Sequence, residues 1–365
     1  MTVLAAAIVA VVIVVSGSGG NAGQPRATTS ASASASRAAT GHPGSASTTT
    51  SRSQTASRPR AEPATGPFRV GIIPVPIVEP SSAAAANGRT ASGAPARLLP
   101  TMVRYPARGT PGPTSAPAAR PASAAGPFPL IVFSQGYDVH AESYAWLLDA
   151  WARAGFVVAD PTYPFTDPST PGGVNETDIV NHPADLRFTI SALEAQARDP
   201  ASPLHGLVNP SEVAIIGHSD GGDVTAAVAA NSCCSDPRVK AAVILSGAEL
   251  ASFGGTYSSG RAVPLMVVQG DADTINVPGC SVGIYNQAHP PKYFVDLPGS
   301  EHEQPYLDPG ALRSHIAQGV VDFLRLSLQH QRSRLAALRR VATLPGQMSI
   351  TTAASLARST YCPGA

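Results

Sequence analysis

Three short segments of the chain carry residues whose types and spacing could support nucleophilic chemistry, and the first of them surrounds Ser219. It reads Gly217-His218-Ser219-Asp220-Gly221 and lies between an apolar run, EVAIIGH, and a segment with helical spacing. Glycines at these positions permit a sharp strand-to-helix turn that presents the serine hydroxyl at the carboxyl end of a sheet. A serine hydroxyl is a weak nucleophile until a base takes its proton, and that base needs a third group to orient it.

The expected base is His302, in the segment Gly299-Ser300-Glu301-His302. Of the nine histidines in the chain, only His302 lies in the turn directly after the last expected strand, YFVDLP. His218 lies inside the turn, His289 precedes a strand and so belongs to the opposite edge, and His315 lies in the last expected helix. The carboxyl ends of parallel strands meet at one edge of a sheet, so we expect His302 to approach Ser219.

The expected orienting acid is Asp273, and Asp271 is the alternative. Both follow the apolar run VPLMVVQ within the segment Gly270-Asp271-Ala272-Asp273-Thr274. Asp273 has one more residue of turn with which to reach back toward His302, and geometry decides between the two acids. We expect Asp271 to cap the turn through its own backbone, as aspartate often does.

An oxyanion requires two converging backbone N–H groups. We expect one from Asp220, the residue after the nucleophile, and the other from Tyr137 in the turn Ser134-Gln135-Gly136-Tyr137. Gly136 allows the chain to bend at that point. The Tyr137 ring then either forms a wall of the acyl site or simply packs on the loop.

The elements that must position these residues begin at Phe68, where strand-length apolar runs alternate with helical spacing. This alternation predicts an α/β fold with a mainly parallel sheet, helices on both faces and an antiparallel edge made by the first two segments. The expected strands are 68–78, 97–107, 128–134, 156–164, 212–219, 239–247, 263–271 and 291–299, and the expected helices are 142–156, 178–197, interrupted near Pro183, 220–232, 281–288 and 311–329.

The N-terminal part of the chain has the composition of an export signal and a spacer. Thirteen uninterrupted apolar residues, Val3–Val15, precede small residues, which suits a secretory signal better than a membrane span; an uncleaved anchor is the alternative. No aromatic or large aliphatic residue follows until Pro67, so residues 23–66 are expected to stay disordered. We therefore divide the chain into a signal peptide or anchor (1–22), a linker (23–66), a catalytic domain (67–330) and a C-terminal extension (331–365).

Charge and cysteine content narrow the function classes further. A net charge of +1 argues against a nucleic-acid binder. Four cysteines, Cys233, Cys234, Cys280 and Cys362, permit disulfides in an exported chain; three pairings are possible, and an adjacent pair rarely forms. The spacing of cysteine and histidine does not fit zinc, and we expect neither a metal nor a cofactor.

The segment between the expected strand 239–247 and the acid-bearing strand that follows it is too short for a lid. Only about 17 residues, 248–264, separate these strands, and they are rich in glycine and serine. A helical cap would not fit there. The cleft should therefore be open, and suited to short-chain esters or to the surface of a bulky or polymeric ester.

Several motifs together carry a resemblance to the α/β-hydrolase superfamily: PLIVFSQGY, FVVADPTYP, NETDIVNHPADLRF, GHSDGG, GDADTINVP and GSEH. The chain resembles the bacterial branch that groups chlorophyllases, dienelactone-hydrolase-like proteins, and the platelet-activating-factor-acetylhydrolase and polyester-hydrolase types. The resemblance covers roughly residues 67–330. Two departures stand out, because many relatives have histidine where Gln135 stands and dienelactone hydrolases use cysteine where this chain has Ser219.

These observations predict an exported serine hydrolase that cleaves carboxylic esters, with Ser219, Asp273 and His302 as its triad. Its partners would be a small-molecule or polymeric ester and, through the N-terminal segment, the cell envelope, with no nucleic acid. Two other functions use the same residues or fold. An acyltransferase would replace water by an acceptor alcohol, and a non-catalytic envelope protein would keep the fold for binding.

Overall fold

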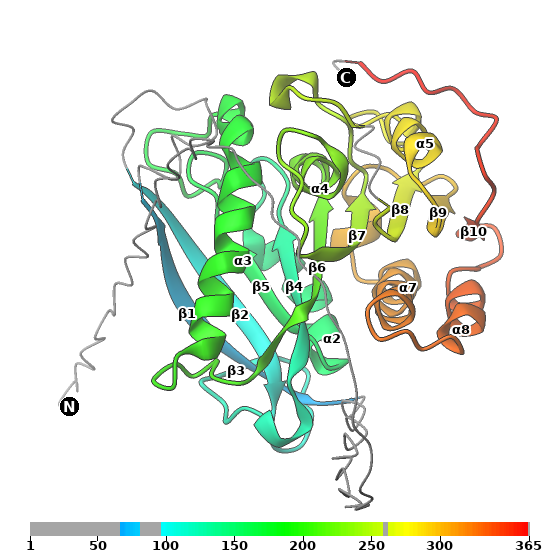
Figure 1. Ribbon diagram of the computed structural model, residues 1–365. Helices are drawn as coiled ribbons and strands as arrows, with labels where there is room; N and C mark the ends of the chain where they lie inside the picture. The colour runs from blue at the N-terminus through cyan, green and yellow to red at the C-terminus, as the bar shows by residue number, and fades with distance from the viewer. Residues whose placement is uncertain (1–65, 81–95, 258–261, 364–365) are drawn as a thin grey trace, which may run out of the picture. The chain divides into compact units, whose positions relative to one another are not determined.

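A ten-stranded sheet organises the part of the chain that the computed structural model describes, which is residues 66–80, 96–257 and 262–363 (Figure 1). The strand order is β10-β9-β8-β7-β6-β4-β5-β2-β1-β3. The strand bounds are β1 Arg69–Glu79, β2 Arg97–Ala107, β3 Ala116–Pro117, β4 Phe128–Ser134, β5 Val157–Pro161, β6 Val208–His218, β7 Val239–Leu245, β8 Leu265–Gly270, β9 Lys292–Leu297 and β10 Ser349–Thr351.

The middle of the sheet is parallel and its edges are antiparallel. Strands β5, β4, β6, β7, β8 and β9 pair in parallel from neighbour to neighbour. Strands β1 and β2 pair antiparallel along their whole length, from Arg69 opposite Ala107 to Glu79 opposite Arg97, and β2 pairs antiparallel with β5. The expected antiparallel edge made by the first two segments is confirmed.

Helices cover both faces of this sheet. One face packs against α3 (His182–Arg198), α4 (Asp220–Ala230) and α5 (Pro278–Gln287), with Ile190, Val224 and Val282 buried in its core. The other face packs against α2 (Ala145–Arg153), α7 (Ala311–Ser327) and α8 (Arg334–Val341), with Trp151 and Phe323 fully buried. The short α6 (Gln304–Leu307) and the 3₁₀ turns η1 (Ser123–Ala125), η2 (Ala141–Tyr144), η3 (Glu176–Asn181) and η4 (Ala251–Phe253) complete the list of helical elements in the described residues.

This arrangement is the predicted α/β architecture, but three local features differ from expectation. Pro183 does not interrupt a helix: it lies in the first turn of α3, where the missing N–H costs no hydrogen bond. β3 lies between residues 107 and 128, where the sequence predicts no strand. β10 adds a strand beyond residue 330 by pairing antiparallel with β9.

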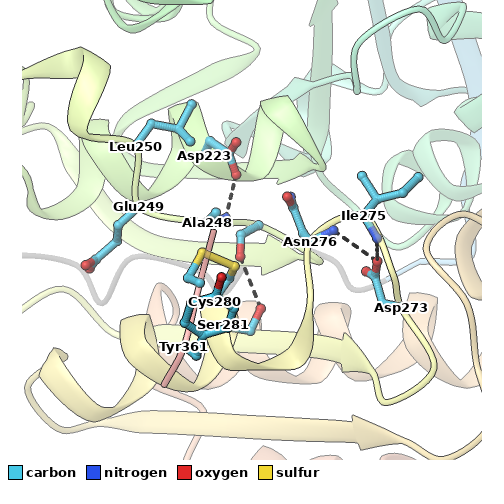
Figure 2. The surroundings of a disulfide bond; sticks show 12 residues. Asp223, Ala248, Glu249, Leu250, Asp273, Ile275, Asn276, Cys280, Ser281 and Tyr361 are labelled. Carbon is cyan, nitrogen blue, oxygen red and sulfur yellow. Dashed lines mark hydrogen bonds between the residues drawn. A yellow bond between two sulfur atoms is a disulfide. The ribbon is translucent and has the colours of Figure 1, made fainter. Parts of the chain in front are cut away.

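Two disulfides are formed. One joins Cys280 of α5 to Cys362 near the end of the described chain, across 82 residues (Figure 2). The other joins the neighbours Cys233 and Cys234, although adjacent cysteines rarely pair. The predicted signal (1–22) and all but the last residue of the predicted linker (23–66) lie outside the described residues. No helix among the described residues is both long and apolar enough to cross a membrane.

Candidate active site

The turn between β6 and α4 holds Ser219 in a strained backbone conformation. Its φ of 57° and ψ of −127° lie in a region that side-chain-bearing residues rarely adopt. The flanking glycines are required for steric reasons: a Cβ on Gly217 would collide with the carbonyl of Gly221, and a Cβ on Gly221 would collide with the carbonyl of Ser134. The GxSxG spacing thus allows β6 and α4 to pack closely around an outward-facing serine.

The structure brings the three predicted triad residues into one chain of hydrogen bonds. The hydroxyl Oγ of Ser219 lies 2.8 Å from His302 Nε2, and His302 Nδ1 lies 2.7 Å from Asp273 Oδ2. Each residue comes from the carboxyl end of a different parallel strand, β6, β9 and β8 respectively. These are the distances that a nucleophile, its base and the orienting acid require.

Asp273, rather than Asp271, reaches His302. The other carboxylate oxygen of Asp273 accepts hydrogen bonds from the amides of Ile275 and Asn276, as Figure 2 shows. Burial acts to raise the pKa of Asp273, but its hydrogen bond and charge interaction with His302, aided by these donors, hold that pKa below its usual value. Asp271 is exposed and accepts from the amide of Gly299 at 2.6 Å, so it bonds to the loop after β9 and not to the backbone of its own turn, where the sequence predicts its contact.

The loop after β4 lies directly against Ser219. A Cβ added to Gly136 would lie 3.1 Å from the Cβ of Ser219, so this loop approaches closely only because Gly136 has no side chain. Tyr137, the predicted second oxyanion donor, follows Gly136 and is partly buried, and Asp220, the predicted first donor, begins α4. Gln135 is buried, and among the described residues neither end of its side-chain amide has a partner.

A buried network beneath the three residues was not predicted. The hydroxyl of Tyr144 donates to His218 Nδ1 at 2.7 Å and accepts from the amide of Gly136, while His218 Nε2 donates to the carbonyl of His302 at 3.0 Å. Burial, together with His302, lowers the pKa of His218 to about 3, so this ring stays neutral. His218 therefore ties the loop after β4 to the backbone of His302, through contacts that its position in the motif does not indicate.

Gln269 is a second unpredicted residue, and it supports the acid. Its Nε2 donates to Asp273 Oδ2 at 3.1 Å, and its Oε1 accepts from the hydroxyl of Ser281 at 2.6 Å. The hydroxyl of Ser281 also contacts the carbonyl of Gly247. Gln269 is the penultimate residue of β8, where strand alternation alone gives no sign of such a role.

The sequence of this chain matches a known protein family. The model of a family described as PET hydrolase-like, PETase, matches residues 112–327, which is more than half of the chain. The chain belongs to this family. The resemblance to polyester hydrolases of the α/β-hydrolase superfamily is thereby confirmed, and with it the fold class and an ester hydrolase of the α/β-hydrolase type. A comparison with curated proteins finds no match.

The hydrolase has an open hollow beside His302. It has a volume of about 570 Å³ and lies between the loop after β8 and the loop after β9. Exposed acids, Glu301, Glu303 and Asp308, are among the residues that line it, together with the exposed side chain of Ile275. In the described part of residues 248–264, the single 3₁₀ turn η4 is the only helical element, so the described residues there form no helical cap.

Asp220, the residue after Ser219, is a buried acid of the hydrolase. Burial and, to a smaller extent, the negative charge of Glu176 raise the pKa of its carboxyl to about 7, although His302 opposes this rise. Asp223, one turn later in α4, is fully buried, and its pKa is raised by burial and by Asp220; its carboxylate accepts from the amide of Ala248 (Figure 2). Asp223 thus has a donor within the fold.

Among the described residues, one group has the residue types and spacing that could hold a metal ion. It consists of Asp178, His182 and Asp185. The two carboxylates of this group already bind Arg97. Its guanidinium donates hydrogen bonds to Asp178 at 2.6 and 2.9 Å and to Asp185 at 2.7 and 2.8 Å. A cation at that place would have to displace a paired guanidinium. The chemistry of this donor set is therefore that of a buried ion pair.

Proposed function

We propose that this protein is a serine carboxylic ester hydrolase that acts through Ser219, His302 and Asp273. The observation that carries the proposal is the continuous path of hydrogen bonds from Asp273 through His302 to Ser219. It lies in a family of ester hydrolases, at the sheet edge where that fold places its nucleophile. The structure and the family support this assignment together, because either alone is compatible with an inert fold.

The proposed reaction follows from the atoms at these distances. Ser219 Oγ attacks the ester carbonyl carbon while His302 Nε2 takes its proton, and Asp273 holds the imidazole in the tautomer that can accept it. The amides of Tyr137 and Asp220 receive the developing oxyanion. The imidazolium of His302 then gives its proton to the departing alcohol oxygen, and a water, activated in the same way, releases the acid from the acyl-enzyme.

The proposed substrates are short-chain esters or the exposed ester bonds of a bulky or polymeric substrate. The hollow beside His302 is open, and the described part of residues 248–264 provides no cap that could enclose a long acyl chain. The exposed Ile275 offers an apolar contact at the rim of that hollow. A surface-accessible cleft of this kind accommodates a chain that extends past the site on both sides.

We also propose that the enzyme works outside the cytoplasm, in solution or at the cell envelope. The apolar run Val3–Val15 has the length of a signal-peptide core, and four paired cysteines suit an oxidising compartment. Expression of the full chain in its host, followed by fractionation and N-terminal sequencing, tests this. Recovery of the unprocessed protein from the cytoplasm alone would refute it.

The decisive test of the chemistry is active-site labelling with a fluorophosphonate probe. Wild type should be labelled at Ser219 and lose ester hydrolysis in proportion, while Ser219→Ala should be folded, unlabelled and inactive. Ser202→Ala is the matched control, since it removes a hydroxyl in the turn after α3, where it accepts from the amide of Leu204, and should be labelled like wild type. Folded wild type that resists the probe, or a Ser219→Ala variant with full activity, would refute the proposal.

A substrate series then defines the specificity. p-Nitrophenyl esters of increasing acyl length and one insoluble polyester should be assayed side by side. Activity that is highest on short chains and present on the polymer supports the open cleft. A strict requirement for long acyl chains would contradict it.

A further inference from the structure

The charges of the chain are distributed unevenly along its sequence. All 24 acidic residues lie between Glu62 and Asp322, where they outnumber the lysines and arginines. Residues 331–365 contain five arginines and no acid. The C-terminal extension is thus a basic segment attached to an acidic domain, and a separation of charge of this kind indicates an anionic partner for the basic segment.

The fold gathers three of these arginines on the surface around α8. This helix lies beside α7, at the end of the sheet that β9 and β10 form (Figure 1). Its Leu338 is fully buried in the core that also contains Phe323 of α7. Outside the core, the exposed side chains of Arg332, Arg339 and Arg340 line one open hollow of about 800 Å³, which we term the arginine hollow.

The arginines of this hollow differ from their neighbour Arg334 in forming no ion pair. Arg334 lies in the same helix and donates to Asp322 of α7 at 3.3 Å. In the described part of the chain, no carboxylate pairs with Arg332, Arg339 or Arg340. Like charges that line one hollow raise each other's energy, so an anion that enters the hollow is bound favourably.

The other side chains in the arginine hollow indicate what kind of anion it fits. Leu335 and Pro345 line it together with the arginines, so it offers apolar contacts beside cationic groups. Guanidinium groups bind phosphate oxygens in pairs of hydrogen bonds. Apolar side chains next to arginines are typical of a protein surface that rests on the headgroups of a lipid bilayer. A soluble polyanion would make use of the arginines alone.

We propose that the arginine hollow is a docking surface for a lipid bilayer with anionic phosphate headgroups. This inference goes beyond the proposed function, because it concerns where the hydrolase is held and not which bond it cleaves. Helix α8 contributes none of the proposed catalytic residues or oxyanion donors. Docking through it therefore leaves the chemistry of the site unchanged.

The test measures binding of the full-length protein to two kinds of vesicle by flotation. Phosphatidylcholine vesicles with about 30% phosphatidylglycerol have a negative surface, and vesicles of phosphatidylcholine alone do not. In about 0.05 M salt, the protein should bind the anionic vesicles at least about tenfold more tightly, and about 0.5 M salt should remove the difference by screening. Equal affinity for the two vesicles at low salt would overturn the proposal.

Substitutions locate the binding. The triple variant Arg332→Gln, Arg339→Gln, Arg340→Gln should lose about 100-fold in affinity for the anionic vesicles, since each arginine near an anionic surface contributes about fivefold. All three positions are exposed, so folding is not at risk. The corresponding triple lysine variant keeps the charges and should bind within a few fold of wild type. A glutamine variant that binds like wild type would refute the assignment of the surface.

A matched control removes three charges elsewhere. Arg108, Arg120 and Arg198 are exposed and form no ion pair among the described residues, so their triple glutamine variant should bind like wild type. The five arginines and the apolar run of residues 1–60 are the same in every variant, so their contribution cancels in the comparison. A loss in the control equal to that in the test variant would show that only net charge matters, against the proposal.

Two further measurements separate this inference from its alternatives. Soluble polyphosphate tests an anionic polymer as the partner: binding of polyphosphate without binding of either vesicle would refute the lipid assignment. Hydrolysis of a soluble ester should be the same in all variants, since none of them changes the candidate site. A protein that docks on anionic vesicles but cleaves no ester contradicts only the proposed function, whereas an active enzyme that ignores the vesicles contradicts only the docking surface.

Discussion

Two groups of acidic residues at the carboxyl edge of the sheet differ in one respect, which is whether the protein supplies a cation. In the first, which we term the Arg97 cluster, Asp178 and Asp185 share the guanidinium of Arg97 on β2. In the second, the Asp220 cluster, Asp220 follows the proposed nucleophile and Glu176 raises the pKa of its carboxyl, and neither acid has such a partner among the described residues. The first group fastens α3 to the antiparallel edge, and the second makes no such link.

The electrostatics of the two clusters follow from this difference. Burial acts to raise the pKa of Asp178, but hydrogen bonds from His182 and Arg97 hold it below its usual value. Burial also raises the pKa of Asp220, and only His302 opposes the rise. Similar burial therefore yields a stable ion pair at Asp178 and a carboxyl with a raised pKa at Asp220. A carboxyl with a raised pKa is a group that binding or catalysis can use.

The largest effect is expected at a third buried acid, Asp273, whose partner is a histidine. Asp273→Asn should lower kcat by about 10⁴-fold while the fold is retained, because the amide favours the wrong tautomer of His302. Asp271→Asn is the matched change two residues away and should alter kcat by only a few fold. Steady-state kinetics with circular dichroism measure both. Equal losses, or the reverse order, would show that the acid has been misassigned.

The next effect concerns the stability of the Arg97 cluster. Arg97→Met should lower the free energy of unfolding by about 3–5 kcal/mol, because two buried carboxylates lose their only guanidinium. Arg358→Met removes an exposed bidentate pair with Asp296 and should cost less than about 1 kcal/mol. Urea denaturation measures the two values. A loss at Arg97 no larger than that at Arg358 would mean that the Arg97 cluster does not stabilise the fold.

A smaller effect is expected from Asp220→Asn, and it should depend on pH. The pKa of Asp220 is about 7 in the folded state and near 3.8 in the unfolded chain, so the folded state holds its proton more tightly between these values. Wild-type stability should therefore fall, relative to the variant, as the pH rises from about 4 to about 7, and the difference should then level off. Thermal melts across this range test it. A difference that does not change with pH would indicate that Asp220 is not a titrating buried acid.

Removal of the N-terminal residues is expected to have no effect on activity toward a soluble ester. A chain that begins at Gly66 should fold and keep the same kcat/KM on a small soluble ester, because residues 1–61 contain no acid and residues 16–66 no aromatic side chain that could join the site. Activity on an insoluble ester could fall through loss of the five arginines in residues 1–60. Loss of activity on the soluble ester would place part of the catalytic site before residue 66.

Sequence alone could predict the site residues that directly follow the carboxyl ends of parallel strands, because these ends meet at one edge of the sheet. Ser219, Asp273 and His302 each follow the carboxyl end of a buried strand, and the parallel order of those strands brings the three side chains together. The choice between Asp273 and Asp271 also agrees with the geometry, because the additional residue of turn reaches His302. Most strands and helices were predictable for the same reason, since their apolar periodicity is strong.

Other features depend on long-range contacts that a linear pattern does not encode. Glu176 of η3 acts on the charge of Asp220 although 44 residues separate them in the sequence. The same is true of His218, whose ring binds the backbone of His302 rather than facing Ser219. β10 is only three residues long and lacks alternation, so its pairing with β9 could not be read from the sequence.

The disulfide between Cys280 and Cys362 makes the assembly of the candidate site sensitive to the compartment in which the chain matures. It closes a loop of 82 residues, and a cross-link of that span removes conformational freedom from the unfolded chain worth about 4 kcal/mol. Cys280 lies in the first turn of α5, just after the loop that carries Asp273, and Gly279 beside it leaves no room for a Cβ against the backbone of Tyr361. Oxidation during maturation therefore clamps the end of the chain onto the helix that follows the acid loop, and a thiol reductant added to the finished enzyme should release the C-terminal strap well before the sheet unfolds.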